Sequence, residues 1–170
     1  MKLTTLLAFI SLAAIFAGCK KPETAPPPPG DAPVPTEAQA KLPTMTLYLG
    51  AETLDAELAL TPREEQTGMM FRTNIQETDS MLFVLPYPQR ASFWMTNCPE
   101  SLSAAYIGPD GVIEEIHHLE KNDSVPVEAS SDNVQFVLET SDGWFDRHNI
   151  HPGTLVRTER GSLSRTFLRR

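Results

Sequence analysis

TMTLYLGAETLDAELAL, residues 44–60, alternates apolar and polar side chains on either side of a Gly-Ala pair. Alternation with a period of two places one set of side chains on one face of a strand, whereas a helix needs a period near 3.6. Gly50-Ala51 separates the two alternating runs and supplies the kind of residue that a tight turn prefers. The sequence therefore predicts a β-hairpin at the start of the folded part.

A short helix is predicted directly after the hairpin, because Thr61-Pro62-Arg63-Glu64 combines residues that begin helices. The threonine can cap the first turn, the proline fits the first helical position, and the glutamate can reach back to the cap. Gly68 then offers a left-handed stop. We expect the helix to end near that glycine.

Further apolar runs, separated by turn residues, follow at 81–85, 93–95, 102–107, 112–119 and 134–138. Residues 142–145 are predicted to begin a second short helix, and residues 163–168 to form a last strand. Many short strands with turns between them predict a mainly β fold, a small antiparallel barrel or sandwich with one or two short helices. No internal repeat is visible, so residues 44–170 are predicted to form a single β-rich domain.

The segment before this domain is rich in proline. Residues 20–43 hold eight of the chain's 15 prolines and no aromatic residue. Such a composition favours extended polyproline II over a packed core. At about 3.1 Å per residue the segment could reach roughly 70 Å. Residues 19–43 are therefore predicted to be a tether.

The beginning of the chain has the pattern of an exported protein. A lysine precedes an apolar run at 3–17, which is short for a membrane span of about 20 residues. Phe16-Ala17-Gly18-Cys19 resembles the bacterial lipoprotein signal. The resemblance implies that residues 1–18 are removed, that Cys19 is lipidated, and that the protein is anchored to a membrane of the cell envelope. In a diderm cell this would be the outer membrane, facing the periplasm. An ordinary secreted protein with an unmodified cysteine is the alternative.

Composition excludes several classes of function. The formal net charge is −8, from 14 Lys and Arg against 22 Asp and Glu, so no nucleic-acid partner is expected. Two cysteines cannot build a disulfide scaffold or a structural zinc site. The expected partners are the membrane, through Cys19, and a small ligand or an envelope protein.

Four blocks of the chain resemble one known family. TPREEQTGMMFR (61–72), DSMLFVLP (79–86), ASFWMTN (91–97) and VQFVLETSDGWFDRHNIHPG (134–153) are similar to the Domain of Unknown Function 192 family. The resemblance extends over roughly residues 53–156, nearly all of the folded part. It implies a small, mainly β domain, and it brings no established activity, cofactor or metal.

The chain departs from that family's pattern at several positions. Ser80, Thr96 and Cys98 stand where the family usually has glycine, lysine and threonine. Glu100-Ser101-Leu102-Ser103 replaces an Ile-Pro-Leu-Asp block, and Gly153-Thr154 replaces Gly-Asp. The loss of two aspartates argues against carboxylate catalysis or hard-metal binding. It favours a binding module without catalytic residues.

Five residues are candidates for a binding site. In an extended strand, Phe93 and Asn97 would face one side, and Trp94 would face the other, where it could offer a stacking surface. Arg72 and Glu139 are predicted to form a bidentate ion pair that closes the barrel or lines a polar pocket. Trp144, together with Arg147 and His148, could line the rim of a cleft. Packing and ordinary surface roles are the alternative for all of them.

Two enzymatic or metal-binding alternatives remain open. Glu139 with a histidine could serve an envelope hydrolase, although no nucleophile motif accompanies them. Met95-x-x-Cys98 and His148-x-x-His151 offer soft ligands of the kind that Cu(I) prefers. Methionines also fill irregular cores, so packing competes with the copper hypothesis. No cofactor and no metal are part of the preferred interpretation.

Overall fold

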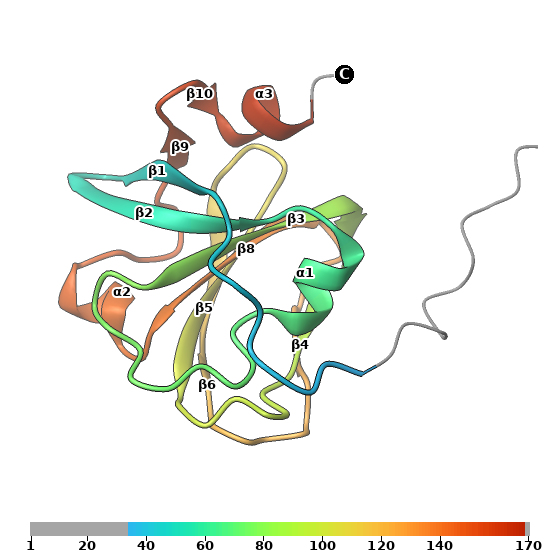
Figure 1. Cartoon of the computed structure of the whole chain (residues 1–170). Coiled ribbons are helices and arrows are strands. Elements are labelled where there is room, and N and C mark those ends of the chain that lie inside the picture. The colour runs from blue at the N-terminus through green and yellow to red at the C-terminus, as the bar shows by residue number, and fades with distance from the viewer. Residues whose placement is uncertain (1–33, 169–170) are drawn as a thin grey trace, which may run out of the picture. The chain divides into compact units, whose positions relative to one another are not determined.

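Strands predominate in the computed structural model of the protein, which describes residues 34–168 (Figure 1). They are β1 (Thr44–Leu49), β2 (Glu52–Ala59), β3 (Ser80–Gln89), β4 (Ser92–Phe93), β5 (Leu102–Ile107), β6 (Ile113–Leu119), β7 (Val127–Glu128), β8 (Val134–Ser141), β9 (Val156–Thr158) and β10 (Gly161–Ser162). The helices are α1 (Pro62–Thr67), α2 (Trp144–Arg147) and α3 (Leu163–Phe167). The prediction of a mainly β fold is confirmed. The predicted signal peptide and Cys19 lie outside the described residues.

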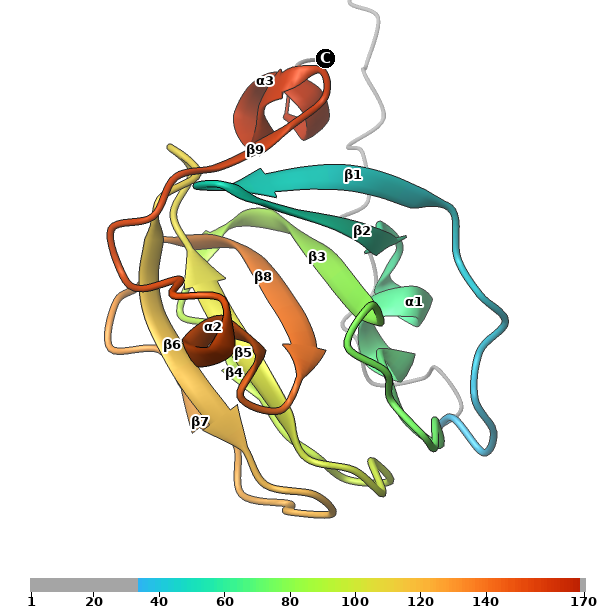
Figure 2. The ribbon, with the colours of Figure 1, turned by 90° about the vertical axis from the view of Figure 1, so that its left-hand side faces the viewer.

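Eight strands form one curled sheet in the order β10-β9-β1-β2-β3-β8-β5-β6 (Figure 2). Its pairings are antiparallel except for β2 and β3, which run parallel. A parallel pair needs a crossover, which residues 60–79 provide together with α1. At one corner the Ile113 N–H donates to the Thr154 carbonyl at 2.9 Å, and the Val156 N–H donates to the Gly111 carbonyl at 2.8 Å. These bonds draw β6 and β9 together and curl the sheet toward a barrel.

The first hairpin and helix form as their residues predict. Leu47 lies opposite Leu54, and Gly50 takes a positive φ of 62° in the turn between the two strands. At α1, the Glu64 N–H donates to the Thr61 hydroxyl at 3.3 Å, and the Thr61 N–H donates to the Glu64 carboxylate at 2.9 Å. This capping box confirms the predicted helix start.

Apolar side chains pack in two clusters, and β8 contributes to both. Phe136 and Leu138 belong to one cluster and Val137 to the other, as expected for successive residues of a strand. All eight residues of β8 are buried, because β3 and β5 flank it and both of its faces are covered. A polar residue on this strand is therefore removed from water by its position.

Two predicted strands differ from the structure. β4 ends at Phe93, so residues 94–101 form a loop that connects to β5. Residues 163–168, predicted as a strand, contain helix α3, which Ser162 caps by accepting a hydrogen bond from the Arg165 N–H at 3.2 Å. Leu163 and Phe167 are four residues apart and so lie on one side of this helix, which packs against the first cluster.

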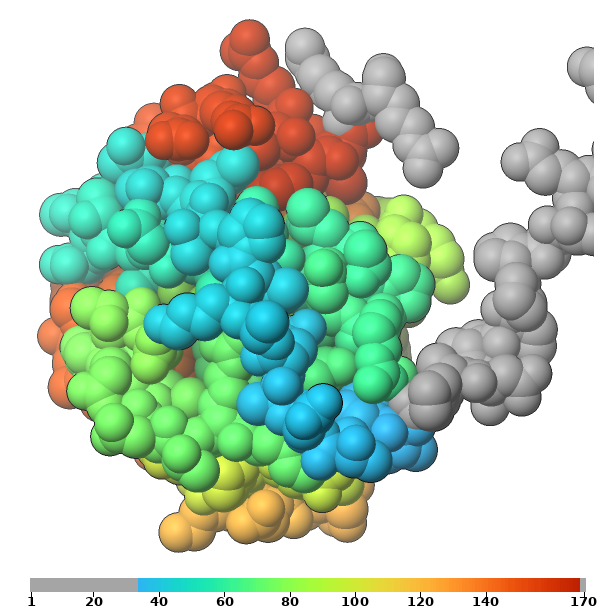
Figure 3. Space-filling view, viewed as in Figure 1, coloured from blue at the N-terminus to red at the C-terminus, as the bar shows by residue number. Residues whose placement is uncertain are grey.

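Part of the predicted tether contacts the domain. The Gln39 side-chain amide donates to the carbonyls of Glu64 and Gly68, at 3.2 and 2.8 Å. Leu42 packs against the second apolar cluster, and Figure 3 shows this blue segment lying along the face of the domain. Within residues 34–168, no helix is long and apolar enough to cross a membrane.

Candidate functional site

A polar pocket of about 520 Å³ opens where the connections that follow α1, β4, β6 and β8 meet. Its lining combines charges of both signs with two hydroxyl groups, from Ile75, Glu77, Pro99, Glu100, Ser101, Lys121, Ser141, Asp142 and Arg147. Polar side chains that converge on a cavity from separate segments can fix the orientation of a small ligand. We take this pocket as the candidate functional site.

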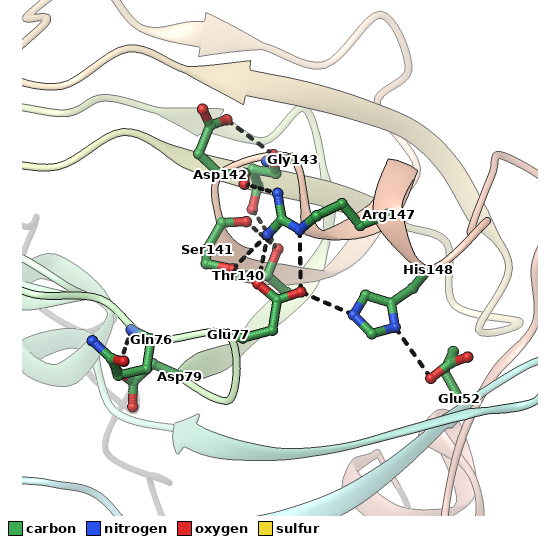
Figure 4. A network of polar contacts seen from close by, with 11 residues as sticks. Glu52, Gln76, Glu77, Asp79, Thr140, Ser141, Asp142, Gly143, Arg147 and His148 are labelled. Atoms are coloured by element: carbon green, nitrogen blue, oxygen red, sulfur yellow. Dashed lines mark hydrogen bonds and ion pairs between the residues drawn. The ribbon is translucent and has the colours of Figure 1, made fainter.

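The Glu77–Arg147 ion pair forms one wall of the pocket (Figure 4). Arg147 Nη2 donates to Glu77 Oε2 at 2.6 Å, and Nε donates to Oε1 at 3.2 Å. Hydrogen bonding from Arg147 lowers the pKa of Glu77 to about 2, with smaller contributions from His148 and Ser141. Glu77 is therefore a fixed negative charge and a weak base.

Gly143 allows Arg147 to fold back toward the pocket. Gly143 has a φ of 71°, and an added Cβ would lie 2.8 Å from Arg147 Nη1. The same Nη1 donates to the Asp142 carbonyl at 2.7 Å. The left-handed backbone favours glycine here, and the missing side chain leaves room for the guanidinium in this position.

His148 extends this network away from the pocket. Its Nε2 lies 2.9 Å from Glu77 Oε1 and its Nδ1 lies 3.2 Å from Glu52 Oε2, so the imidazole bridges two carboxylates (Figure 4). The ring stacks on Trp144 at a centroid distance of 4.2 Å. Trp144 itself is only 2% exposed and belongs to the core. The prediction that Trp144 lines the rim of a cleft is therefore wrong. Trp144 instead packs against the His148 ring from the core.

A second histidine pairs with Asp142 at the pocket. His118 Nδ1 lies 2.8 Å from Asp142 Oδ1, and His118 Nε2 lies 3.2 Å from Glu120 Oε2. Hydrogen bonding to Glu120 and then to Asp142 raises the pKa of His118. The Asp142 carboxylate thus combines a contact with an exposed imidazole and a place in the pocket lining.

The loop that follows β4 provides another part of the pocket lining. Glu100 accepts hydrogen bonds from the backbone N–H groups of Asn74 and Ile75, which ties this loop to the α1–β3 connection. The Ser101 hydroxyl donates to Glu120 and accepts from the Lys121 N–H at 3.1 Å. Glu100 and Lys121 therefore bring charges of opposite sign to the lining.

Arg72 binds Glu57, and the predicted direct pairing with Glu139 is wrong. Arg72 Nη1 and Nη2 donate to the two carboxylate oxygens of Glu57 at 2.6 and 2.8 Å. Burial alone would raise the pKa of Glu57, but the hydrogen bonds from Arg72 and from the Leu42 N–H outweigh it and lower the pKa. The pair is almost fully buried, with 13% and 6% of the two side chains exposed. It ties the α1–β3 connection to β2.

Glu139 is buried on β8 at 5% exposure. Within residues 34–168, no hydrogen bond or ion pair joins its carboxylate to another side chain. Burial raises the pKa of Glu139 to about 8, although the nearby charge of Arg72 acts in the opposite direction. No described histidine pairs with it, so the geometry of the predicted Glu139–His hydrolase is not formed.

Trp94 and Asn97 lie in the loop after β4. Trp94 is 53% exposed, so it can offer a stacking surface, although the predicted strand alternation does not apply to it. Asn97 has a φ of 63°, and its carbonyl accepts a hydrogen bond from the Phe71 N–H at 2.7 Å. Neither residue lines the pocket. Of the five predicted binding residues, the structure brings Arg72 near Glu139, and it groups none of them in the cavity.

Met95 and Cys98 pack in the second apolar cluster, at 2% and 6% exposure. Burial and the charge of Glu139 raise the pKa of the Cys98 thiol to about 12, which opposes the thiolate that a copper ligand requires. In residues 34–168, no group of three or more His, Cys, Asp or Glu residues could hold a metal ion. The arrangement favours packing over copper binding.

Sequence reasoning did not identify Glu77, Lys121 and Asp142 as pocket residues. They come from connections that are far apart in the chain and carry no motif. The Glu100-Ser101 pair was visible as a departure from a family pattern, and the Asp142-Gly143 pair as a helix start. Only the tertiary fold brings Glu77, Glu100, Ser101, Lys121 and Asp142 together.

The chain belongs to the DUF192 family, described as "Uncharacterized ACR", whose model matches residues 45–158. The resemblance seen in the sequence is thereby confirmed. No curated protein matches the chain.

Two crystal structures share the fold. One is a "putative transcription regulator" from Sinorhizobium meliloti 1021, with a TM-score of 0.67 and 24% identity, covering 71% of this chain and 98% of that one. The other is a protein of unknown function from Novosphingobium aromaticivorans DSM 12444, with a TM-score of 0.66 and 28% identity, covering 76% of this chain and 95% of that one. These similarities describe the architecture and assign no chemistry.

Proposed function

We propose that the protein is an exported, lipid-anchored envelope protein whose domain binds a small polar ligand without catalysis. The lipoprotein-like sequence at 16–19 and the proline-rich segment that follows support the anchor and the tether. The observation that carries the binding role is the pocket, because five charged side chains from separate segments converge there.

The distribution of charge suggests the kind of ligand. Arg147 and Glu77 already satisfy each other, so they serve mainly as a rigid wall. Glu100 and Asp142 each use only part of the acceptor capacity of a carboxylate, which can take about four hydrogen bonds. Lys121 adds a positive charge to the lining. A small zwitterion fits this arrangement, with its cationic group on the carboxylates and its anionic group toward Lys121.

A hydrolase is the second candidate, supported by the two histidine–carboxylate pairs at the pocket. Glu77 and Asp142 line the cavity and contact His148 and His118. The low pKa of Glu77 makes it a poor general base, and burial opposes ionisation of the Cys98 thiol. Binding therefore explains the site with fewer assumptions.

The binding role can be tested by NMR titration of the protein with free amino acids, amino sugars and phosphorylated sugars. We expect shifts at Ser101, Lys121 and Asp142 for a zwitterionic compound. Lys121→Ala should weaken its binding about tenfold, whereas Lys41→Ala, which removes an equally charged side chain that does not line the pocket, should not change it. A compound that binds equally well to both variants would place the binding site elsewhere.

The anchor has its own test. Mass spectrometry of the protein purified from its membrane should show a mature chain that begins at an acylated Cys19. A chain that retains Met1 and an unmodified thiol would refute the anchor and leave the pocket hypothesis intact.

A further inference from the structure

The end of the chain is opposite in charge to the rest. Residues 157–170 contain five arginines and one glutamate, whereas residues 1–156 contain nine Lys and Arg against 21 Asp and Glu. More than a third of the cations therefore lie in the last 14 residues. A charge asymmetry of this kind indicates a partner of opposite charge for one part of the surface.

The structure presents three of these arginines on ordered elements. β9 and β10 form a hairpin, α3 follows it directly, and Arg157, Arg160 and Arg165 on these elements are all exposed. Arg160 contacts Glu159 at 3.9 Å, with 69% and 52% of the side chains exposed, which makes a weak pair. Within residues 34–168, Arg157 and Arg165 have no ion-pair partner. We call β9, β10 and α3 the C-terminal cap.

The C-terminal cap is fixed to the sheet. β9 pairs with β1, with Arg157 opposite Tyr48. The Thr158 hydroxyl lies 2.8 Å from the Thr166 hydroxyl, which joins the hairpin to α3, and Leu163 is fully buried. The cap therefore holds its arginines on a rigid support.

Apolar side chains accompany the arginines. Leu155, just before β9, is 45% exposed, and Leu168, just after α3, is 38% exposed. Arginine beside exposed leucine is the composition of surfaces that contact the headgroup region of a membrane. An acidic protein partner would account for the charges and leave the exposed leucines without a role.

The C-terminal cap and the pocket lie at opposite ends of the domain. Figures 1 and 2 show α3 and β9 at the top, whereas the connections after α1 and β4, which contribute to the pocket, lie at the bottom. In Figure 3 the red C-terminal residues form the upper surface. A surface that binds the cap would therefore leave the pocket open on the far side.

We propose that the C-terminal cap docks on the anionic phospholipid surface in which Cys19 is anchored, so that the pocket faces away from the membrane. This inference rests on the anchor of the proposed function. The strongly acidic remainder of the chain would be repelled by the same surface, which selects one orientation. Each arginine near an anionic bilayer strengthens binding about fivefold at low salt, and the effect falls within a Debye length.

The experiment uses the full mature chain in nanodiscs that carry a spin-labelled headgroup lipid, with amide relaxation measured by NMR. In nanodiscs with anionic phosphatidylglycerol we expect strong broadening at residues 155–168 and none at residues 99–101. Neutral phosphatidylcholine or 0.5 M salt should abolish the broadening. The variant Arg157→Gln/Arg160→Gln/Arg165→Gln should lower the docking constant about hundredfold. Lys41→Gln/Arg90→Gln, which neutralises exposed cations elsewhere, should change it little.

The outcomes separate the cap from the anchor. Binding of the protein to neutral nanodiscs reports the anchor alone. The additional broadening of amide signals in anionic nanodiscs reports docking of the C-terminal cap. If Cys19 carries no lipid, the anchor fails, and the same chain mixed with anionic nanodiscs still tests the cap. Equal broadening in both lipids would overturn the inference. So would a salt-sensitive dimer in sedimentation without lipid binding, because the cap would then meet the acidic surface of a second copy.

Discussion

Glu57 and Glu139 flank Met81 on the same face of the sheet, and only Glu57 holds a guanidinium. Glu57 lies opposite Met81 across the parallel pair β2–β3, and Met81 lies opposite Glu139 across β3–β8. Arg72 donates two hydrogen bonds to Glu57 and none to Glu139. One buried carboxylate is therefore stabilised as an anion, whereas the other is stabilised in its neutral form.

Replacing Arg72 by methionine should strongly destabilise the protein. The substitution leaves the Glu57 carboxylate buried without its cation, and breaking a buried pair from one side typically costs about 3–5 kcal/mol. Urea unfolding at pH 7 measures the loss. Arg90→Met, at an exposed position, should change the stability by less than about 0.5 kcal/mol. A loss for Arg72→Met as small as that of the control would show that the pair contributes little.

Glu139→Gln should remove a pH dependence of stability. The folded-state pKa of about 8 exceeds the ordinary value of 4.5, so the folded protein holds a proton that the unfolded chain releases. Stability from this group is complete below pH 4.5 and is lost as the pH rises toward 8. The free energies of unfolding of the two proteins should therefore be similar near pH 5, and the variant should be the more stable protein at pH 8.5. Parallel curves would refute the raised pKa.

Arg147→Ala should return the pKa of Glu77 toward its ordinary value. The lowered pKa of about 2 depends first on the hydrogen bond from Arg147. Carboxyl carbon shifts in an NMR pH titration would report the change. The associated stability is present above pH 4.5 and fades as the pH falls toward 2. Because both side chains are 49% exposed, solvent screening should keep this stability small.

The Cys98 thiol should resist modification in the folded protein. It is 6% exposed and its pKa is about 12, so both access and the thiolate fraction are low at pH 8. A chromogenic disulfide reagent should react with Cys98 only after guanidinium is added. Rapid reaction of the native protein would indicate a local opening of the loop after β4.

Local patterns predicted the elements whose signals are contained within a few neighbouring residues. The 44–60 hairpin follows from period-two alternation, and the start of α1 follows from four consecutive residues. Residues 163–168 were misread because a short apolar run fits a strand or a helix turn equally well. The loop at Trp94 was misread for the same reason, since an aromatic run does not reveal where pairing ends.

The site depends on contacts that no local pattern encodes. Arg72 has two buried glutamates within its electrostatic reach, and the parallel register of β2 and β3 brings Glu57 to the same face as Glu139. The sequence predicts antiparallel pairing, and this prediction does not place Glu57 near Glu139. The pocket likewise requires four connections to meet, which depends on how far the sheet curls.

The parallel crossover at residues 60–79 supplies both Arg72, which pairs with Glu57 of β2, and Glu77, which lines the pocket. An insertion or deletion between these two positions would shift one against the other. Under the proposed binding role, stability and ligand selectivity are coupled through the length of a single connection. Members of the fold in which this connection differs in length should then also differ in the ligands that their cavities accept.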